Sequence, residues 1–316
     1  MTRDLHTQIK TDYEERSRTG AVGLKVNLYT ALDVTGLDAS VDAVEWESIR
    51  LECVMVGDSI LTTHHGRSTT QLRDAADRQW ANVVLTEAIA EVSGALQEST
   101  RLAGVYLMAD LQDGSLESDE RLLDTAQGFV AAGADAVKLE VAGPDSLHGI
   151  EELAATGVPV FGHLGYTPQT AQLRRHGQTS PERGELYRSA RAVRDSGACG
   201  LILEMVDPVA NAALSAPSPN GIPCFSIFSG PTVQGGGLSV NAWDAVFRHP
   251  SGARGFPPTA FLDVANFPEQ YTVRNVTHGM TKLLGLVSEG LFPESTRLTD
   301  KCDQLVPEEP WHAGHP

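Results

Sequence analysis

Short apolar runs alternate with longer amphipathic segments along almost the whole chain, and this alternation restricts the possible folds more than any other feature. The runs are bounded by Gly, Asp or Pro, which is typical of strands buried in a parallel sheet. We predict strands, the last one weaker than the others, at Val22–Leu28, Glu52–Gly57, Gly104–Ala109, Asp135–Leu139, Val158–Gly162, Cys199–Leu203, Ile222–Ile227 and Leu238–Asn241. Helices are predicted between and after them, at Leu72–Leu96, Ser118–Ala132, Asp145–Ala155, Pro181–Ser196 and Pro268–Ser288.

The repeated strand–helix unit predicts an α/β fold with a parallel sheet, and the number of units favours a closed (β/α)8 TIM-type barrel. The length of 316 residues suits one barrel, which needs about 250 residues plus insertions. We therefore expect a single catalytic domain over residues 1–300, with an N-terminal helical extension. An open doubly wound sheet is the alternative, but no G-x-G-x-x-G segment follows the first strand.

The last part of the chain, residues 301–316, has little apolar pattern. We expect it to be a flexible tail, as chain ends without packing residues commonly are. His312 and His315 lie in this tail, and disorder is a simpler interpretation of them than a metal site.

Composition excludes several classes of partner. The formal net charge of −17 argues against nucleic acid and against an anionic membrane surface, both of which attract clustered Lys and Arg. No apolar stretch approaches the roughly 18 residues that suggest a membrane span, and no signal peptide is recognisable. The four cysteines are scattered without metal-type spacing, as expected of reduced thiols. We expect a soluble cytoplasmic protein that acts on small molecules.

Five consecutive predicted strands end in ionisable residues. In order along the chain, these residues are Asp58, Asp110, Lys138 with Glu140, His163 and Glu204. The carboxyl ends of barrel strands meet on one face, where active sites of this fold are built. Carboxylates that converge there repel one another unless a cation lies among them, and hard oxygen ligands suit Mg²⁺. The pattern therefore predicts a metal-dependent active site.

Each of these residues also has a plain structural interpretation. An Asp that follows a strand often caps a helix or forms a turn. A lysine such as Lys138 can pair with a neighbouring carboxylate, and His163 can cap a turn. The agreement of five successive strand ends favours the active-site interpretation over these separate ones.

Several segments resemble the ketopantoate hydroxymethyltransferase family. The matching segments are V-G-D-S at Val56–Ser59, A-D at Ala109–Asp110, A-D-A-V-K-L-E at Ala134–Glu140, V-P-V-F-G-H-L-G-Y-T-P-Q-T at Val158–Thr170 and L-I-L-E at Leu201–Glu204. They occur in the family's order between about residue 20 and about residue 295, and the G-H-L-G-x-T-P-Q part is the most specific. The resemblance implies a barrel enzyme, in homo-oligomers that are often decamers.

The resemblance also implies roles for particular residues. Asp58 and Asp110 correspond to aspartates that bind Mg²⁺ or another divalent cation, and Glu140 corresponds to an acidic residue of the metal shell. Ser59 corresponds to a group near the substrate carboxylate. The co-substrate implied by the family is 5,10-methylenetetrahydrofolate, with free formaldehyde or another aldehyde as the alternative donor.

The expected reaction makes a carbon–carbon bond beside the keto group of a 2-oxo acid. Lys138 and His163 correspond to residues that hold the oxo acid and its developing negative charge, and Glu204 to the proposed base. A metal chelated by the carboxylate and keto oxygens makes the adjacent C–H bond more acidic. A carboxylate on the other side of the substrate can then remove the proton, and Lys138 stabilises the enolate.

The chain departs from the family in its loops while it keeps the metal and base positions. The departures lie at Asn27–Asp33, Val34–Trp46, Ile60–His65, Arg174–Thr179, Ser226–Gly230 and Gly235–Gly237. Phe228 adds bulk at a strand end where the family has glycine, so we expect a paralogue that acts on a different 2-oxo acid. An ordinary ketopantoate-forming enzyme is the alternative. We interpret His64 and His65 as surface-loop residues.

Two other functions compete with this hypothesis. A phosphoenolpyruvate mutase or isocitrate-lyase-like enzyme also forms Mg²⁺-stabilised enolates, but no K-x-C-G-H-type segment is present. A non-catalytic binding barrel is the other rival, and the retention of all the ionisable strand ends argues against it.

Overall fold

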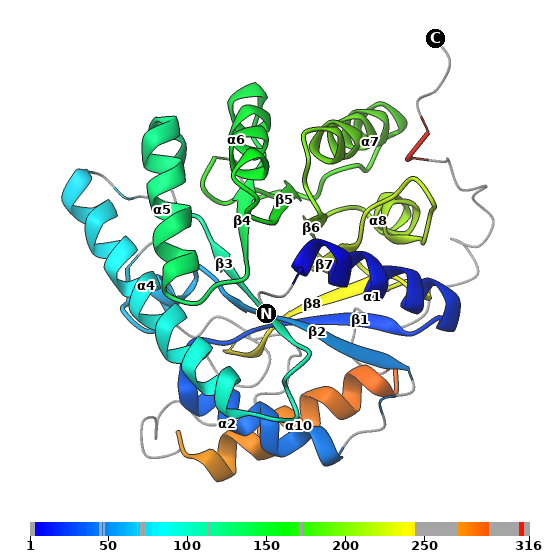
Figure 1. Cartoon of the computed structure of the whole chain (residues 1–316). Coiled ribbons are helices and arrows are strands. Elements are labelled where there is room, and N and C mark those ends of the chain that lie inside the picture. Colours follow the sequence, from blue (N-terminus) through cyan, green and yellow to red (C-terminus); the bar gives the residue numbers. More distant parts are fainter. Residues whose placement is uncertain are drawn as a thin grey trace.

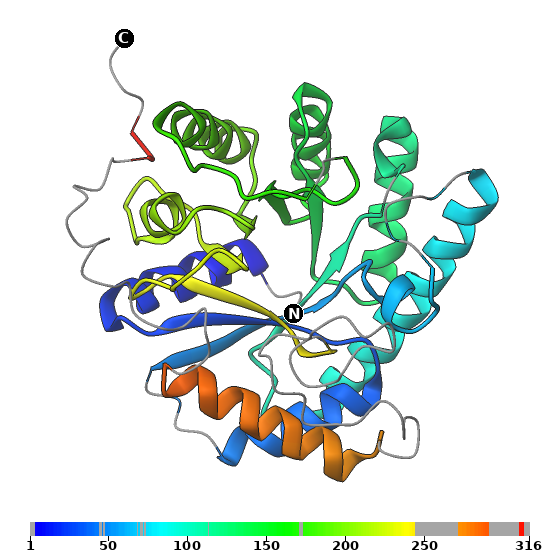
Figure 2. The ribbon, with the colours of Figure 1, turned by 180° about the vertical axis from the view of Figure 1, so that it is seen from behind.

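A computed structural model of the chain describes residues 4–43, 46, 48–67, 69, 72, 74–112, 114–170, 173–243, 271–290 and 310–312. Eight parallel strands close into a barrel in chain order, and helices surround it (Figures 1 and 2). The strands are β1 (Val22–Asn27), β2 (Ile49–Val56), β3 (Tyr106–Asp110), β4 (Ala136–Glu140), β5 (Val160–Gly165), β6 (Gly200–Glu204), β7 (Cys224–Ile227) and β8 (Gly237–Asn241). The prediction of a (β/α)8 TIM-type barrel is confirmed.

The helices and 3-10 turns outside the barrel include several that the sequence patterns did not indicate. In order, they are α1 (Leu5–Thr19), α2 (Ala31–Ser40), η1 (Val41–Ala43), α3 (Ile60–Thr63), α4 (Ala75–Glu98), η2 (Ser115–Glu117), α5 (Asp119–Ala131), α6 (Pro144–Ala155), α7 (Ser180–Asp195), α8 (Pro208–Ser215) and α10 (Val273–Ser288). The predicted helices over α4 to α7 are present. The apolar pattern did not indicate α2, although Thr30 begins this helix with a capping box that includes Asp33. It also missed the short helices α3 and α8, which are too short for a helical period to be evident.

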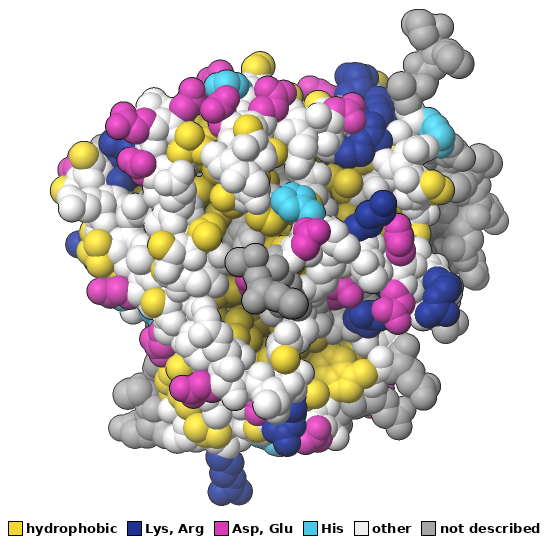
Figure 3. All heavy atoms as spheres, viewed as in Figure 1, with side chains coloured by type: hydrophobic (Ala, Val, Ile, Leu, Met, Phe, Trp, Pro, Cys, Tyr) yellow, Lys and Arg dark blue, Asp and Glu magenta, His cyan; other side chains and the backbone are white. Residues whose placement is uncertain are grey.

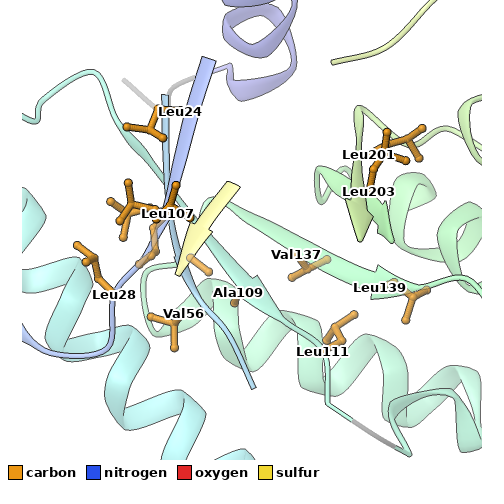
Figure 4. Close-up of a cluster of buried hydrophobic side chains, with 14 of the residues drawn as sticks. Leu24, Leu28, Val56, Leu107, Ala109, Leu111, Val137, Leu139, Leu201 and Leu203 are labelled. Carbon is orange, nitrogen blue, oxygen red and sulfur yellow. The ribbon is translucent and has the colours of Figure 1, made fainter. Parts of the chain in front are cut away.

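Strand residues that point outward belong to the larger of two apolar clusters, together with residues of the surrounding helices. They include Leu24, Leu107, Val137 and Leu203, which lie between the sheet and the surrounding helices (Figure 4). Because the strands are covered by helices on the outside and filled on the inside, both faces are buried, and this explains their continuous apolar runs.

Inward-pointing residues change character along β3, β4 and β5. The second apolar cluster fills the barrel with side chains such as Met108, Ala136 and Phe161. Side chains repeat on one face every two residues, so the next inward positions are Asp110, Lys138 and His163, and all three are buried. These three strands are therefore apolar at mid-height and ionisable at their carboxyl ends.

Helix α1 covers the opposite end of the barrel. The register of β1 and β2 passes from Leu24↔Leu51 to Lys25↔Cys53, so Glu52 is an extra residue on β2. A bulge of this kind re-aims side chains, and Glu52 is buried beneath α1, where its Oε2 lies 3.2 Å from Arg16 Nη1. A Cβ at Gly23 would lie 1.8 Å from that nitrogen, so only glycine leaves room for the guanidinium.

Helices α2 and α10 lie side by side against the barrel (Figures 1 and 2). Gly36 permits the contact, since a Cβ there would lie 2.3 Å from Val276 Cγ1. The helix predicted at Pro268–Ser288 is present from Val273 onward, and residues 268–270 lie outside the described residues. None of the helices in the described ranges is long and apolar enough to cross a membrane.

Of the segment predicted to be a flexible tail, the structure describes only residues 310–312. Residues 301–309 and 313–316 lie outside the described residues, but Trp311 between them is only 2% exposed. Its Nε1 donates to the carbonyl oxygen of Leu214 at 3.3 Å, and the Arg194 guanidinium lies over its ring. Burial of a large indole with its polar atom satisfied is a sufficient reason for this segment to pack against the barrel.

Candidate active site

The ionisable strand ends meet at one end of the barrel, as the sequence predicted. Asp110 of β3 is in register with Lys138 of β4, and Glu140 of β4 is in register with His163 of β5. Glu204 closes β6 and is in register with Gly165, two residues beyond His163. Asp58 follows the end of β2 after a single residue, Gly57. Four adjacent strands and one strand-following residue thus supply the whole set.

Lys138 and the two aspartates form one part of this site. Lys138 Nζ donates to Asp110 Oδ2 at 2.6 Å, and both side chains are buried. The backbone N–H of Asp58 points to the same Asp110 oxygen at 3.4 Å. The other oxygen of Asp110, Oδ1, is buried and has no hydrogen-bond partner among the described residues. An unpartnered buried carboxylate oxygen is expected where a ligand or ion completes a site.

His163 connects the other two carboxylates. Its Nδ1 lies 3.8 Å from Glu140 Oε1, and its Nε2 lies 3.4 Å from Glu204 Oε2. His163 and Glu140 are buried, whereas the Glu204 side chain is 21% exposed. Glu204 therefore lies at the accessible side of the site, and His163 lies beneath it.

Burial and mutual repulsion favour the protonated form of two carboxylates. Burial, followed by the nearby charge of Asp110, raises the pKa of Asp58 to about 7. Burial raises the pKa of Glu140 to about 8 in spite of the attraction of Lys138, and the negative charges of Asp110 and Asp58 add to the increase. These carboxyl groups bind protons near neutral pH unless a cation replaces the protons.

The two basic groups respond in opposite directions. Burial alone would lower the pKa of Lys138, but the carboxylates of Asp110, Asp58 and Glu140 raise it above its ordinary value. Burial, and then the charge of Lys138, lower the pKa of His163. At neutral pH the site therefore contains a cationic lysine and a neutral imidazole.

Gln169 joins the two parts of the site and was not singled out from the sequence. Its backbone N–H donates to Glu140 Oε2 at 3.1 Å, and its Nε2 donates to Asp58 Oδ2 at 3.3 Å and to the carbonyl oxygen of Leu111 at 3.1 Å. The residue belongs to the G-H-L-G-x-T-P-Q segment, so the specificity of that segment was the available signal. Gln169 fixes the orientation of both carboxylates.

Neutral polar groups occupy the other side of the barrel mouth. Ser59 Oγ lies 2.5 Å from the hydroxyl of Tyr29, to which Asn241 Nδ2 donates at 3.2 Å. These residues come from the ends of β1, β2 and β8, and of the three only Ser59 was predicted to belong to the site. The alternation of side chains along a strand does not show whether an asparagine at its end, such as Asn241, belongs to a site or forms a turn.

The interpretation of His64 as a surface residue is wrong. His64 is partly buried, and its ring meets Trp243 edge-on, with the ring centroids 4.2 Å apart. Its ring also meets that of Tyr29, at 5.2 Å. The next residue, His65, is exposed and contacts Trp80. The aromatic partners come from distant parts of the chain, so local sequence did not show them.

Two residues that follow strands of the site have left-handed backbone conformations. Met205 after β6 has φ 53°, and Phe228 after β7 has φ 52°. Such values are uncommon outside glycine and are often found at functional sites. The backbone at Phe228 thus keeps the conformation that suits the family's glycine, while the side chain is much larger. The departing segment Arg174–Thr179 contributes to a cavity of about 730 Å³ beside α7.

The donor set fits a divalent cation, although no three side chains hold one alone. Within the described part of the chain, no three His, Cys, Asp or Glu side chains are gathered closely enough to form a metal site. Mg²⁺ is commonly bound by one or two carboxylates together with substrate oxygens and waters. Asp58 and Asp110 supply two carboxylates, and Oδ1 of Asp110 is buried without a hydrogen-bond partner among the described residues. The oxygens of Glu140 face Gln169 and His163 instead, so its place in the metal shell stays a prediction.

A parallel barrel with carboxylates, a lysine and a histidine at the carboxyl ends of its strands defines a TIM-barrel enzyme. The family model for ketopantoate hydroxymethyltransferase matches residues 23–249. The chain belongs to this family of transferases. A 3-methyl-2-oxobutanoate hydroxymethyltransferase of Pyrobaculum islandicum is 34% identical over 193 residues, 59% of this chain and 68% of the relative. One from Desulfotalea psychrophila is 26% identical over 293 residues, 90% of this chain and 93% of the relative.

Solved structures with a similar fold come from other enzymes. Oxaloacetate acetylhydrolase in complex with 3,3-difluorooxalacetate has a TM-score of 0.53 and 15% identity, and the match covers 90% of this chain and 97% of that chain. 2,3-Dimethylmalate lyase, a member of the PEP mutase/isocitrate lyase superfamily, has a TM-score of 0.50 and 12% identity, covering 85% and 94%. At these identities the likeness concerns the fold alone.

Proposed function

We propose that the chain is a metal-dependent hydroxymethyltransferase that enolises a 2-oxo acid and adds a one-carbon hydroxymethyl unit beside the keto group. The arrangement that supports this best is the separation of functions across the site. Asp110 and Asp58 lie on one side with Lys138, and Glu204 lies on the other side with His163. A substrate between them meets acidic oxygens and an ammonium on one side and a base on the other.

The metal shell is proposed to consist of Asp58 and Asp110, with Glu140 nearby. A divalent cation bound there would act as a Lewis acid toward the oxo acid. The residues of the chain prepare this place: Gln169 holds Asp58, and Lys138 holds Asp110. Mg²⁺ suits the oxygen donors, and other divalent ions with the same preference are alternatives.

Lys138 and His163 are proposed to bind the substrate oxygens. The Lys138 ammonium has three N–H donors, and Asp110 accepts only one of them. The others can bind the carboxylate and the enolate oxygen that develops from the keto group. The neutral His163 imidazole offers one N–H, and Glu204 or a substrate oxygen can accept it. Buried donors of this kind stabilise developing negative charge more strongly than water does.

Glu204 is proposed to remove the proton. Its carboxylate is partly exposed, so a substrate carbon can reach it. The C–H electron pair becomes the enolate, and the proton stays on Glu204. The enolate carbon then attacks the electrophilic one-carbon unit to form the new carbon–carbon bond. 5,10-Methylenetetrahydrofolate can supply this unit when water hydrolyses it to tetrahydrofolate and formaldehyde. The carbonyl oxygen of formaldehyde becomes the hydroxyl group and takes the proton back from Glu204.

Deuterium exchange tests the proposal without a one-carbon donor. Protein with Mg²⁺ in deuterated water is mixed with 3-methyl-2-oxobutanoate, 2-oxobutanoate, pyruvate or oxaloacetate, and proton NMR follows the carbon beside the keto group. We expect metal-dependent exchange with at least one acid. Folded protein that binds Mg²⁺ and exchanges none of a broad panel contradicts the enolising function.

Metal affinity is expected to depend on pH. Because burial and Asp110 raise the pKa of Asp58 to about 7, protons compete with the cation below that pH. We expect Mg²⁺ affinity to fall by up to about tenfold per unit between pH about 7 and about 6, and to change less between about 7 and 8. Calorimetric titration at these pH values measures it. Asp58→Asn is the matched control and should bind weakly at every pH; an affinity that does not vary with pH in the native protein contradicts the prediction.

The remaining partners belong to the same proposal. The ligands are a small 2-oxo acid and a one-carbon donor, with no nucleic acid or membrane partner. Figure 3 shows acidic side chains spread over one face with basic ones among them, which supports small-molecule rather than polyanion binding. We also propose a homo-oligomer, which light scattering of the purified protein measures directly.

A further inference from the structure

Tyr166 lies beside the proposed base, and the reaction as described so far does not use it. It is the first residue after β5, whose last residue, Gly165, is in register with Glu204 of β6. The backbone N–H of Tyr166 donates to the carbonyl oxygen of Glu204 at 2.7 Å, so the pairing of the two strands continues for one more residue. Tyr166 is therefore held at the carboxyl end of the barrel, next to the residue that is proposed to remove the proton.

Gly165 turns the chain at this point. Its φ is 97°, in the left-handed region, and a Cβ there would lie 2.1 Å from the carbonyl oxygen of Glu204. Only glycine accepts both this conformation and this close approach of another backbone. The turn interrupts the alternation of the strand, so the direction of the next side chain depends on its surroundings rather than on the strand period.

The segment that begins with Tyr166 links the two carboxylates next to His163. At one end Tyr166 binds the backbone of Glu204. A few residues later, Gln169 donates its backbone N–H to Glu140 Oε2 at 3.1 Å. Because the chain between these two attachments is short, Tyr166 stays close to both carboxylates.

Two observations place the Tyr166 side chain on the site side of this segment. Gly165 and Thr167, on either side of it, line the cavity of about 730 Å³ beside α7, whereas Tyr166 does not. Burial raises the pKa of the Tyr166 hydroxyl, and the negative charges of Glu204 and Glu140 raise it further. The hydroxyl therefore lies in the electric field of both carboxylates, and it is protonated at neutral pH.

The Tyr166 hydroxyl is an unused hydrogen-bond donor. The side chain is partly buried, and no residue in the described ranges forms a hydrogen bond with its hydroxyl. By contrast, the hydroxyl of Tyr29 lies 2.5 Å from Ser59 Oγ and also accepts from Asn241. A phenol has one O–H to donate, and a partly buried tyrosine commonly finds a partner for it. The free O–H of Tyr166 is therefore available to a ligand in the site.

The second half of the proposed reaction needs a donor at this place. When the enolate carbon attacks an aldehyde, the electrons of the C=O double bond move to the oxygen, which is an alkoxide until it accepts the proton held by Glu204. For that transfer the oxygen must lie within hydrogen-bond reach of Glu204. In the proposed arrangement Lys138 and His163 bind the oxygens of the oxo acid. Tyr166 is then the free donor beside the point where the new negative charge develops.

We propose that Tyr166 is a catalytic residue of the step that forms the carbon–carbon bond, and that its hydroxyl donates a hydrogen bond to the carbonyl oxygen of the aldehyde. The inference rests on the proposed function, because it takes Glu204 to be the base. It assigns different residues to the two halves of the reaction: Glu204 removes the proton, and Tyr166 activates the electrophile. The phenol stays protonated throughout, and the proton that Glu204 took from carbon is the one that the alkoxide receives, so no other proton donor is needed.

Measuring the two halves of the reaction separately in Tyr166→Phe tests this role. Deuterium exchange of the best acid of the panel, without an aldehyde, reports on proton removal, and product formation with added formaldehyde reports on the whole reaction. We expect exchange within about threefold of the native protein, because the proposed base and metal residues are intact. We expect kcat for the hydroxymethyl product to fall by about 10²- to 10³-fold, the usual loss when one donor to a developing oxyanion is removed. Cleavage of that product in the reverse direction, followed by the release of formaldehyde, should fall by the same factor.

Tyr13→Phe is the matched control. Tyr13 lies on α1, which covers the opposite end of the barrel, and its hydroxyl accepts from the backbone N–H of Ser218 at 3.0 Å. We expect exchange and product formation in this variant to match those of the native protein. Both substitutions keep the aromatic ring and remove a single oxygen atom, so the fold should persist, and circular dichroism checks it.

The outcomes separate this inference from the function on which it rests. Product formation within about threefold of native in Tyr166→Phe overturns the inference. An equal loss of exchange and of product formation also overturns it, because Tyr166 would then act through Glu204 rather than on the electrophile. Native protein that exchanges none of the acids contradicts the proposed function itself, whatever the variant does.

Discussion

Replacing Glu204 by glutamine is expected to reduce metal-dependent deuterium exchange by about 10²- to 10⁴-fold, the usual contribution of a general base. The amide keeps the size and polarity of the side chain but cannot take a proton from carbon. The Glu204 carboxylate is partly exposed and lies 3.4 Å from His163 Nε2, a contact that the glutamine side chain can retain. Exchange rates by NMR, with the best acid of the panel, measure the effect.

Glu98→Gln is the matched control for this experiment. Glu98 is an exposed residue at the carboxyl end of α4, which leads into the amino end of β3, whereas the site lies at the carboxyl ends of the strands. We expect exchange in this variant to match the native protein. Mg²⁺ titration should show that Glu204→Gln still binds the cation, since Asp58 and Asp110 are untouched. Exchange within about threefold of native in Glu204→Gln would assign the base to another residue and remove the main support for the proposed mechanism.

Glu52→Ala is expected to reduce the free energy of unfolding by about 3–5 kcal/mol, because it leaves a buried charge without its partner. Arg16 is completely buried beneath α1, and Glu52 is its ion-pair partner. Nε and Nη2 of Arg16 have no hydrogen-bond partner in the described chain, and the guanidinium otherwise lies over the Phe225 ring at 5.2 Å. Urea denaturation followed by circular dichroism measures the change.

Two comparison variants make this result specific to the buried pair. Glu15 of α1 pairs with Arg50 at the surface, 2.5 Å away, so Glu15→Ala should cost less than about 1 kcal/mol. The double variant Arg16→Met with Glu52→Leu should recover most of the lost stability, since apolar replacement of both partners removes the uncompensated charge. A cost for Glu52→Ala no larger than that for Glu15→Ala contradicts the prediction.

The strands and the ionisable ends were predictable because their signals are local. A buried parallel strand needs a continuous apolar run. Side chains two positions apart point to the same face of a strand, so an ionisable residue two positions after an inward-pointing apolar residue also points into the barrel. This explains why Asp110, Lys138, Glu140, His163 and Glu204 lie at one end of the barrel, as expected. The roles assigned to them by resemblance remain predictions.

Contacts between distant segments were not predictable in the same way. His64 contacts Tyr29 and Trp243, and these contacts depend on how the loops after different strands pack. The docking of Trp311 depends on a surface formed by residues nearly a hundred positions earlier. No short-range period reports such contacts, and for this reason a buried tryptophan was interpreted as part of a flexible tail.

The sequence by itself determined a closed α/β barrel, the order of its strands and the chemical type of each strand end, because apolar runs and side-chain alternation act over a few residues. Only the tertiary structure decided which groups meet. The extra residue in β2 brings Glu52 to Arg16, barrel closure places Asn27 beside Asn241, and the inward position of Lys25 brings its ammonium to the Asn27 amide oxygen. These outcomes depend on register and closure, which follow from the packing of all eight strands together.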